Sequence, residues 1–327
     1  MPMRHTLLAV LVAFLWGLNF LAIRFSLDQF PPMFLAGLRF LILALPALLF
    51  IPRPKVPIRH LLGYGLGFGT LQFFGLYLGM AAGFPTGLAS LVLQASAPFT
   101  VVLGALLLKE QVTARRAAGI AVAVAGLALV GVSRGSLDGW LPFLLVLLGA
   151  FGWALGNLAS RKAQTDRPMA LVMWMAVVPP IPLLSIAFLV EGPQEIWAAL
   201  ASSISVETVP AWAGLAYTVL IGTVLGSGIW VWLMRRHPAG VVAPFSMLVP
   251  VVGILAAWLV LDEVPTWLEL AGGMLVVGGV IYASRRGASP VTLSGTDPAT
   301  LETAEHPNRH ESVSPPRYSA TASPNRS

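Results

Sequence analysis

Arg39 is the charged side chain that lies deepest within an apolar stretch, so it is the first candidate for contact with a substrate. Counted from Pro31 at about 1.5 Å per residue, it lies roughly 12 Å along a helix. A guanidinium at that depth needs a polar partner, a water-filled cavity or an anionic ligand. We expect Arg39 to bind a substrate carboxylate. The alternative is a fixed arginine that pairs with backbone carbonyls or a helix end.

Two tryptophan and asparagine pairs form a second group of candidates. Trp16 and Asn19 are three residues apart, Trp153 and Asn157 are four apart, and both spacings place the pair on one helix face. An asparagine in lipid must find hydrogen-bond partners, so both faces are expected to point into a helix bundle. Contact with substrate and contact with a neighbouring helix are both compatible with this pattern.

The remaining candidates are polar or aromatic residues in other apolar runs. Gln72, Gln94 and Ser246 can bind substrate or serve as hydrogen-bonding contacts between helices. Trp174 lies deeper than the tryptophans near span ends and is expected to line a cavity. The full set of expected substrate-binding residues is Arg39, Asn19, Gln94, Asn157, Trp16, Gln72, Trp174 and Ser246.

Other chemistries lack their residues. The chain has no cysteine and no Gly-x-x-x-x-Gly-Lys phosphate loop, and no acidic residue lies centrally in an apolar run. Thiolate sites, ATP hydrolysis and an embedded proton relay are therefore not expected. No cofactor or metal site is predicted, and a catalytic set of paired acids or a nucleophile with its base is missing. Basic residues form no stripe, so nucleic acid is not an expected partner.

Composition places these residues in a membrane. Hydrophobic residues make up 57% of the 327 residues, charged residues only 10%, and mean hydropathy is +0.80. Charge-free runs of about 17 to 25 residues predict membrane-spanning helices. The sequence thus predicts an all-α integral membrane protein with ten helices, near residues 6–26, 31–51, 61–82, 86–108, 114–133, 140–160, 168–190, 210–234, 238–261 and 266–284.

The two halves of the chain look like copies of each other. Adding 153 to a residue number carries Glu110 onto Glu263 and Arg116 onto Glu269, so one equivalent loop is basic and the other acidic. Cytoplasmic loops accumulate Lys and Arg, which predicts that these loops face opposite sides of the membrane. We therefore expect two inverted five-helix repeats, at 1–134 and 135–286, an arrangement typical of transporters.

The distribution of basic residues predicts the orientation. Both termini are expected in the cytoplasm, because alternate loops collect the Lys and Arg residues. The expected cytoplasmic set is Arg4, Arg53, Lys55, Arg59, Lys109, Arg115, Arg116, Arg161, Lys162, Arg167, Arg235, Arg236, Arg285 and Arg286. Residues 287–327 are polar without apolar periodicity and are expected to form a disordered cytoplasmic tail with no transport role.

Several motifs in order resemble one known family. They are the Trp-Gly-Leu-Asn-Phe run from Trp16, the segment from Pro31 to Phe40 that contains Arg39, the segment from Gly87 to Ala95, the segment from Ala243 to Gly253, and Leu261-Asp262-Glu263. Together they resemble the EamA-like branch of the drug/metabolite transporter superfamily, and especially bacterial exporters of O-acetylserine and cysteine. The resemblance implies a ten-helix basket with a central cavity, alternating access, export of small amino-acid-like metabolites and a place in the bacterial inner membrane.

Other functions stay open beside this prediction. Efflux of amphipathic drugs is favoured if the cavity is aromatic and tolerates loss of Arg39. A non-transporting membrane subunit or receptor would show no flux in liposomes. An integral-membrane enzyme is the least favoured class. The sequence leaves a homodimer open, and the expected partners are the lipid bilayer and a small amino-acid-like substrate.

Overall fold

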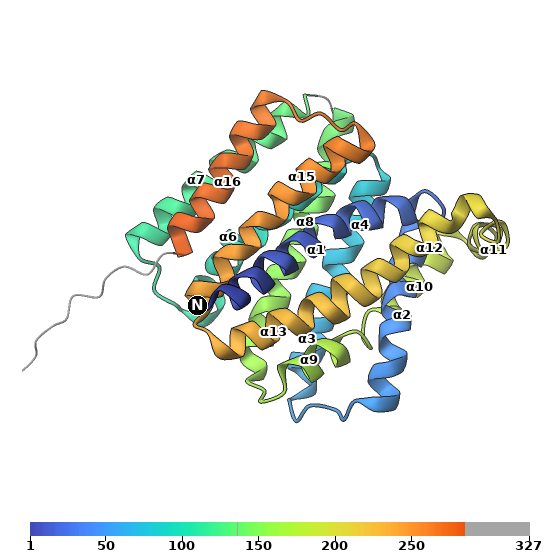
Figure 1. Ribbon diagram of the computed structural model, residues 1–327, viewed down its shortest axis with the longest axis horizontal. Helices are drawn as coiled ribbons and strands as arrows, with labels where there is room; N and C mark the ends of the chain where they lie inside the picture. The colour runs from blue at the N-terminus through green and yellow to red at the C-terminus, as the bar shows by residue number, and fades with distance from the viewer. Residues whose placement is uncertain (136, 285–327) are drawn as a thin grey trace, which may run out of the picture. The chain divides into compact units, whose positions relative to one another are not determined.

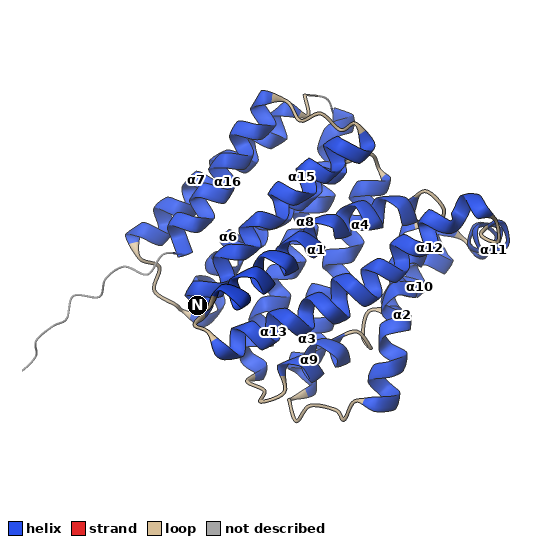
Figure 2. Ribbon diagram, viewed as in Figure 1, coloured by secondary structure: helices blue, strands red, loops and turns tan. Residues whose placement is uncertain are grey.

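The apolar runs fold as helices, because a helix satisfies its own backbone N–H and C=O groups where lipid offers no partner. The computed structural model describes residues 1–135 and 137–284, and within these residues the regular structure is helical throughout (Figure 2). Ten spans in this part of the chain are long and apolar enough to cross a membrane. The predicted all-α membrane fold is confirmed, and each expected span lies within a few residues of an observed one.

Five spans are single helices, and a short helix outside the spans, α11 (Pro193–Ser202), follows the seventh span. The single-helix spans are α1 (Met3–Leu27), α2 (Pro32–Phe50), α7 (Ala114–Ser133), α8 (Leu137–Ala163) and α16 (Trp267–Ser284).

The other five spans are broken into shorter helical pieces. The third is α3 (Ile58–Tyr64), η1 (Gly65–Leu71) and α4 (Gln72–Ala81), and the fourth is α5 (Thr86–Val92), η2 (Leu93–Ala95) and α6 (Ser96–Leu108). The seventh span is α9 (Pro168–Met175), α10 (Pro180–Ile186) and η3 (Ala187–Glu191). The eighth is η4 (Val206–Thr208), α12 (Val209–Ala216), η5 (Tyr217–Leu225) and α13 (Gly226–Arg236). The ninth is α14 (Ala239–Val242), η6 (Ala243–Met247) and α15 (Leu248–Leu261).

Two pairs of equivalent spans break in the same way. The third and eighth spans each contain a π-helical turn, η1 and η5, and the fourth and ninth each contain a 3₁₀ turn, η2 and η6. The 3₁₀ turns have a common cause in Pro98 and Pro250. Proline has no N–H, so neither residue can donate to the carbonyl four positions earlier, and the helix tightens or bends there.

The ends of the fourth and ninth spans also repeat at the backbone level. Lys109 and Asp262 both adopt the left-handed conformation, with φ of 55° and 56°. The next residue, a glutamate in each case, donates its N–H to a carbonyl six positions earlier: Glu110 to Gly104, and Glu263 to Ala257, both at 3.3 Å. The backbone therefore repeats at the same offset of 153 as the sequence.

The fifth and tenth spans, α7 and α16, show that the repeats are inverted. They lie side by side (Figure 1). A Cβ on Gly119 would come within 2.6 Å of the Gly279 carbonyl oxygen, and one on Gly126 within 2.6 Å of the Gly272 carbonyl oxygen. The rising numbers of α7 meet the falling numbers of α16, so these equivalent helices are antiparallel.

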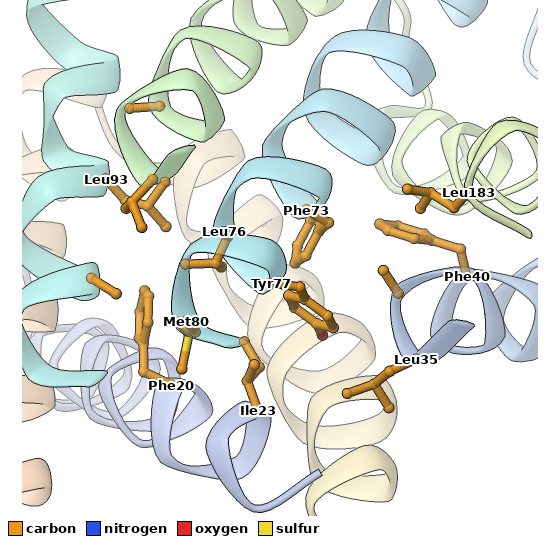
Figure 3. Packing of buried hydrophobic residues seen from close by; sticks show 14 of the residues in the cluster. Phe20, Ile23, Leu35, Phe40, Phe73, Leu76, Tyr77, Met80, Leu93 and Leu183 are labelled. Carbon is orange, nitrogen blue, oxygen red and sulfur yellow. The ribbon is translucent and has the colours of Figure 1, made fainter. Parts of the chain in front are cut away.

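Aromatic and aliphatic side chains from both halves form the core that surrounds Arg39. Figure 3 shows Phe73 and Tyr77 of α4 between residues of α1 and α2, with Leu183 of α10 beside Phe40. The rings of Phe40 and Phe73 meet edge to face at 5.1 Å, and those of Phe73 and Tyr77 at 5.7 Å. This packing fixes the aromatic wall against which the neighbouring arginine lies.

The described residues belong to one compact unit, Met1–Arg286. The predicted tail at 287–327 lies outside the described residues, as do Arg285 and Arg286.

Candidate functional site

Arg39 of α2 is 5% exposed and contacts two other spans. Its Nη2 donates to Oγ1 of Thr223 in η5 at 2.8 Å, and its Nη1 donates to the hydroxyl of Tyr77 in α4 at 3.4 Å. The guanidinium carbon lies 4.1 Å from the centre of the Phe73 ring, a cation–π distance. Nε of Arg39 has no hydrogen-bond partner among the residues that the structure describes. Hydroxyl and aromatic groups thus hold the guanidinium, and its Nε is available to a further acceptor.

The π-helical turn η5 presents Thr223 to Arg39. The Thr223 hydroxyl also donates to the carbonyl of Thr218 at 2.9 Å, which fixes its oxygen as an acceptor for the guanidinium. Thr218 is 1% exposed, and its own Oγ1 has no hydrogen-bond partner in the described part of the chain. Such π-helical turns occur frequently at functional sites, because the extra residue displaces side chains from the regular helical register.

Trp16 and Asn19 of α1 face the same turn, as their shared helix face predicts. Nε1 of Trp16 donates to the Gly222 carbonyl at 2.8 Å. A Cβ on Gly222 would come within 2.5 Å of Oδ1 of Asn19, so only glycine allows this approach. Oδ1 of Asn19 is itself buried, and no described residue donates a hydrogen bond to it. The turn therefore receives Arg39 at Thr223 and Asn19 at the preceding residue.

Gln94 and Ser246 meet where the fourth and ninth spans break. Nε2 of Gln94 donates to the Ser246 carbonyl at 3.3 Å. In a regular helix the Ser246 carbonyl would accept the N–H of residue 250, but Pro250 has no N–H. The glutamine side chain therefore supplies the donor that the helix lacks. The contact links the two broken helices at equivalent points.

Asn157, Gln72 and Trp174 lie in separate environments. Nδ2 of Asn157 in α8 donates to Oγ1 of Thr100 in α6 at 3.2 Å. Gln72 is 5% exposed at the start of α4, and within residues 1–135 and 137–284 its Oε1 has no hydrogen-bond partner. Nε1 of Trp174 donates to the Ile51 carbonyl at 2.8 Å, at the end of α2.

The expected residues thus fall into two groups of three, with Gln72 and Trp174 apart from both. Arg39, Trp16 and Asn19 contact η5, whereas Gln94, Ser246 and Asn157 contact the break of the fourth span or α6. Each group gathers at a helix break that leaves backbone carbonyls or side-chain oxygens without their usual partners. Helix breaks of this kind form substrate sites in transporters, because unwound backbone can bind polar ligands.

Sequence reasoning missed Thr223, Tyr77 and Phe73, the residues that hold Arg39. A threonine and two aromatics in apolar spans are ordinary in membrane helices, and nothing in their spacing marks them. The available signal was the buried arginine itself, which requires hydroxyl, carbonyl or aromatic partners from neighbouring spans.

Two cavities lie at opposite ends of the bundle. The cavity at the Glu263 end has a volume of about 120 Å³ and is lined by Gly87, Leu88, Ile254, Glu263 and Arg134, among others. The cavity at the Glu110 end has a volume of about 270 Å³ and is lined by residues of α6, α7, α8 and α16, including Val101, Glu110, Arg116 and Arg161. Arg39 lines neither cavity.

Glu269 and its basic counterpart Arg116 have different surroundings at these two ends. Glu269 is 2% exposed and forms a salt bridge with Arg134, while its Oε2 accepts from the Thr266 N–H at 2.8 Å. Burial lowers the pKa of Arg134, and the nearby Glu263 carboxylate acts in the opposite direction. Arg116, the counterpart of Glu269, lines the larger cavity instead.

Comparisons with known proteins agree with this architecture. The family model described as "EamA-like transporter family" matches residues 3–132 and 140–285, once in each half. Two relatives named "Probable amino-acid metabolite efflux pump" are 43% identical in Salmonella typhimurium and 41% identical in Escherichia coli, each over 86% of this chain and 94% of the relative. A solved crystal structure at 19% identity superposes with a TM-score of 0.58 and covers 88% of this chain and 100% of its own. The chain belongs to the EamA-like transporter family.

Proposed function

We propose that this chain is a secondary transporter of the bacterial inner membrane that exports small amino-acid-like metabolites, of the O-acetylserine and cysteine type, by alternating access. The observation that carries the proposal is the similarity over nearly their whole length to two relatives named as amino-acid metabolite efflux pumps. The antiparallel pair α7 and α16 supports it, because inverted repeats are a recurrent design of alternating-access transporters.

The proposed orientation follows from loop charge. The Glu110 end carries Lys109, Arg115, Arg116 and Arg161, whereas the Glu263 end carries Asp262, Glu263 and Glu269. Basic loops stay in the cytoplasm, so the Glu110 end and both termini are assigned to that side. The larger cavity is then the one that opens toward the cytoplasm.

The proposed role of Arg39 is to bind the substrate carboxylate. Its unpartnered Nε leaves the guanidinium capable of a further charge-assisted hydrogen bond, and its present partners are neutral hydroxyls that a carboxylate can replace. Asn19, with a free buried acceptor, is placed to receive a substrate ammonium group from the other side of η5. The proposed set of substrate-binding residues also includes Gln94, Asn157, Trp16, Gln72, Trp174 and Ser246.

The remaining parts of the proposal concern chemistry and assembly. We assign the chain no chemical step, since a transporter only moves its substrate. A homodimer is the proposed assembly, and its mass in detergent measured by light scattering tests it.

Reconstituted flux tests the main proposal: liposomes with the purified chain should move labelled cysteine or O-acetylserine faster than empty liposomes. Movement of amphipathic drugs in place of every amino acid in the panel would contradict it.

A further inference from the structure

The two ends of this symmetric chain are held in different ways. Both carboxylate oxygens of Glu263 accept backbone N–H groups at the start of α5, from Thr86 and Gly87, each at 3.0 Å. The counterpart of Glu263 is Glu110, and the counterpart of Gly87 is Gly240. Glu110 makes a different contact, a 2.5 Å salt bridge with Arg161 in which the two side chains are 36% and 52% exposed.

The packing of the two glycines differs in the same way. A Cβ on Gly87 would lie 2.9 Å from Cα of Ile254 and 3.2 Å from Cβ of Ala257, so α5 lies tightly on α15. A Cβ on Gly240 would meet no heavy atom within 4 Å. The surface that Gly240 would contact by symmetry consists of Val101 and Gly104, the counterparts of Ile254 and Ala257.

The two cavities lie at equivalent positions of the two repeats, and the one at the Glu263 end is more closed than the one at the Glu110 end. Ile254, Glu263 and Glu269 line the smaller one, and their counterparts Val101, Glu110 and Arg116 line the larger one. The smaller cavity is also lined by Gly87 and Leu88 of α5. The larger is not lined by their counterparts in the ninth span, and its volume is about 270 Å³ against about 120 Å³.

We propose that Glu110 and Glu263 are alternate latches of the transport cycle. In the opposite state, the start of the Gly240–Leu261 span closes on α6, with Gly240 against Val101 and Gly104. The Glu110 carboxylate then leaves Arg161 and accepts the first backbone N–H groups of that span, while Glu263 releases Thr86 and Gly87. This inference rests on the proposed transport function, because it assigns the latches to its two states.

The energetics allow such an exchange. A carboxylate that accepts two backbone N–H groups gains charge-assisted hydrogen bonds in a sheltered place, whereas a salt bridge as exposed as Glu110–Arg161 contributes little. One latch forms as the other breaks, so the two states have similar contacts. A two-state element of this kind responds strongly to a small bias.

Four variants test the equilibrium between the state with the Glu263 latch closed and the state with the Glu110 latch closed. In a Val101→Cys background, an impermeant thiol reagent added from the Glu110 end reports how open that end is, since the chain has no other cysteine. Glu110→Gln should increase labelling, because it removes the latch of the closed state. Glu263→Gln should decrease labelling, because it removes the latch of the present state. Each change is expected to be about tenfold.

Arg161→Gln separates the latch from an ordinary salt bridge. It frees Glu110 to bind the ninth span, so labelling should fall, in the direction opposite to Glu110→Gln. If Glu110 served only Arg161, the two variants would shift labelling alike, and that result would overturn the proposal. Ile254→Cys, labelled from the other end, should respond with every sign reversed.

Gly240→Leu is the fourth variant, and it tests the closing surface. A Cβ there meets no heavy atom of the described residues within 4 Å, so the variant should fold, keep Val101→Cys open to labelling and lose export. Gly278→Leu is the matched control, because a Cβ there also meets no heavy atom within 4 Å and the position has no part in either latch. Unchanged closure in Gly240→Leu would contradict the proposal. Labelling needs no substrate, so it tests the latches separately from transport. If Glu110→Gln and Glu263→Gln shift labelling in opposite directions but the chain moves no amino acid, the proposed function is refuted and the latch proposal is not.

Discussion

Gly119 of α7 and Gly279 of α16 lie back to back, and each occupies the space that a side chain on the other would need. A Cβ on either residue would come within 2.6 Å of the other's carbonyl oxygen. Because Gly119 corresponds to Gly272 and Gly279 to Gly126, the contact joins non-equivalent glycines of equivalent helices. Gly126 meets Gly272 in the same crossed manner, and only antiparallel copies can form both contacts, so the two contacts together establish the inversion of the repeats.

Gly119→Ala should destabilise the protein. The added methyl group would force α7 and α16 apart, at an overpacking cost of about 1–3 kcal/mol. The measurement is the thermal unfolding midpoint in detergent. Gly278→Ala in α16 is the control and should be neutral or slightly stabilising, because it has free space and alanine favours a helix over glycine. Equal midpoints for both variants would show that the glycine contact does not hold the two helices together.

The loops after the fourth and ninth spans should face opposite sides of the membrane. Gln111 and its counterpart Val264 are both exposed, so single cysteines there can be labelled in a chain that has none of its own. An impermeant reagent should reach Gln111→Cys only from the cytoplasmic side and Val264→Cys only from the outer side, as loop charge predicts. Labelling of both from one side would rule out the proposed topology.

Truncation after Ala288 should leave insertion and export intact. The segment beyond it has no apolar pattern with which to pack against the helices. Flux and yield of the truncated chain are compared with those of the full chain. A truncated protein that folds at full yield but no longer exports would give the tail a role in transport.

The sequence was sufficient for the ten spans. Long apolar runs determine where a membrane helix begins and ends, because lipid tolerates no unpaired backbone. It also placed Arg39 at depth, but the partners Thr223 and Tyr77 depend on how three spans far apart in the sequence are rotated about their axes. Trp174 illustrates the same limit: its depth suggested a cavity, whereas its indole N–H bonds the carbonyl of Ile51.

The difference between Glu110 and Glu263 lies beyond sequence reasoning for another reason. The two glutamates are equivalent in the repeat, and both follow a left-handed residue. Glu263 binds backbone N–H groups, whereas Glu110 binds the arginine side chain of Arg161. The repeat pattern alone does not indicate which glutamate meets backbone N–H groups, so only coordinates show which end is closed.

Arg39 provides the most direct test of the substrate site. Arg39→Lys keeps the charge but loses the planar donor geometry, so export of amino acids should fall partially. Arg39→Gln removes the charge, and export should fall by about 10- to 100-fold, the range expected for a lost charge-assisted hydrogen bond. Flux is measured in liposomes, and the thermal unfolding midpoint is measured beside it.

Thr223→Val and the choice of substrate separate binding from structural support. Thr223→Val removes the hydroxyl that holds Nη2 of Arg39 but leaves the charge, so it should lower stability more than it changes selectivity. If Arg39 binds a carboxylate, Arg39→Gln should fold and lose free amino acids while it still moves their amides or esters. If Arg39 only joins α2 to η5 and α4, both variants should lower the unfolding midpoint and reduce the flux of acids and esters alike. Normal export of free amino acids by a folded Arg39→Gln would exclude the guanidinium from the binding site.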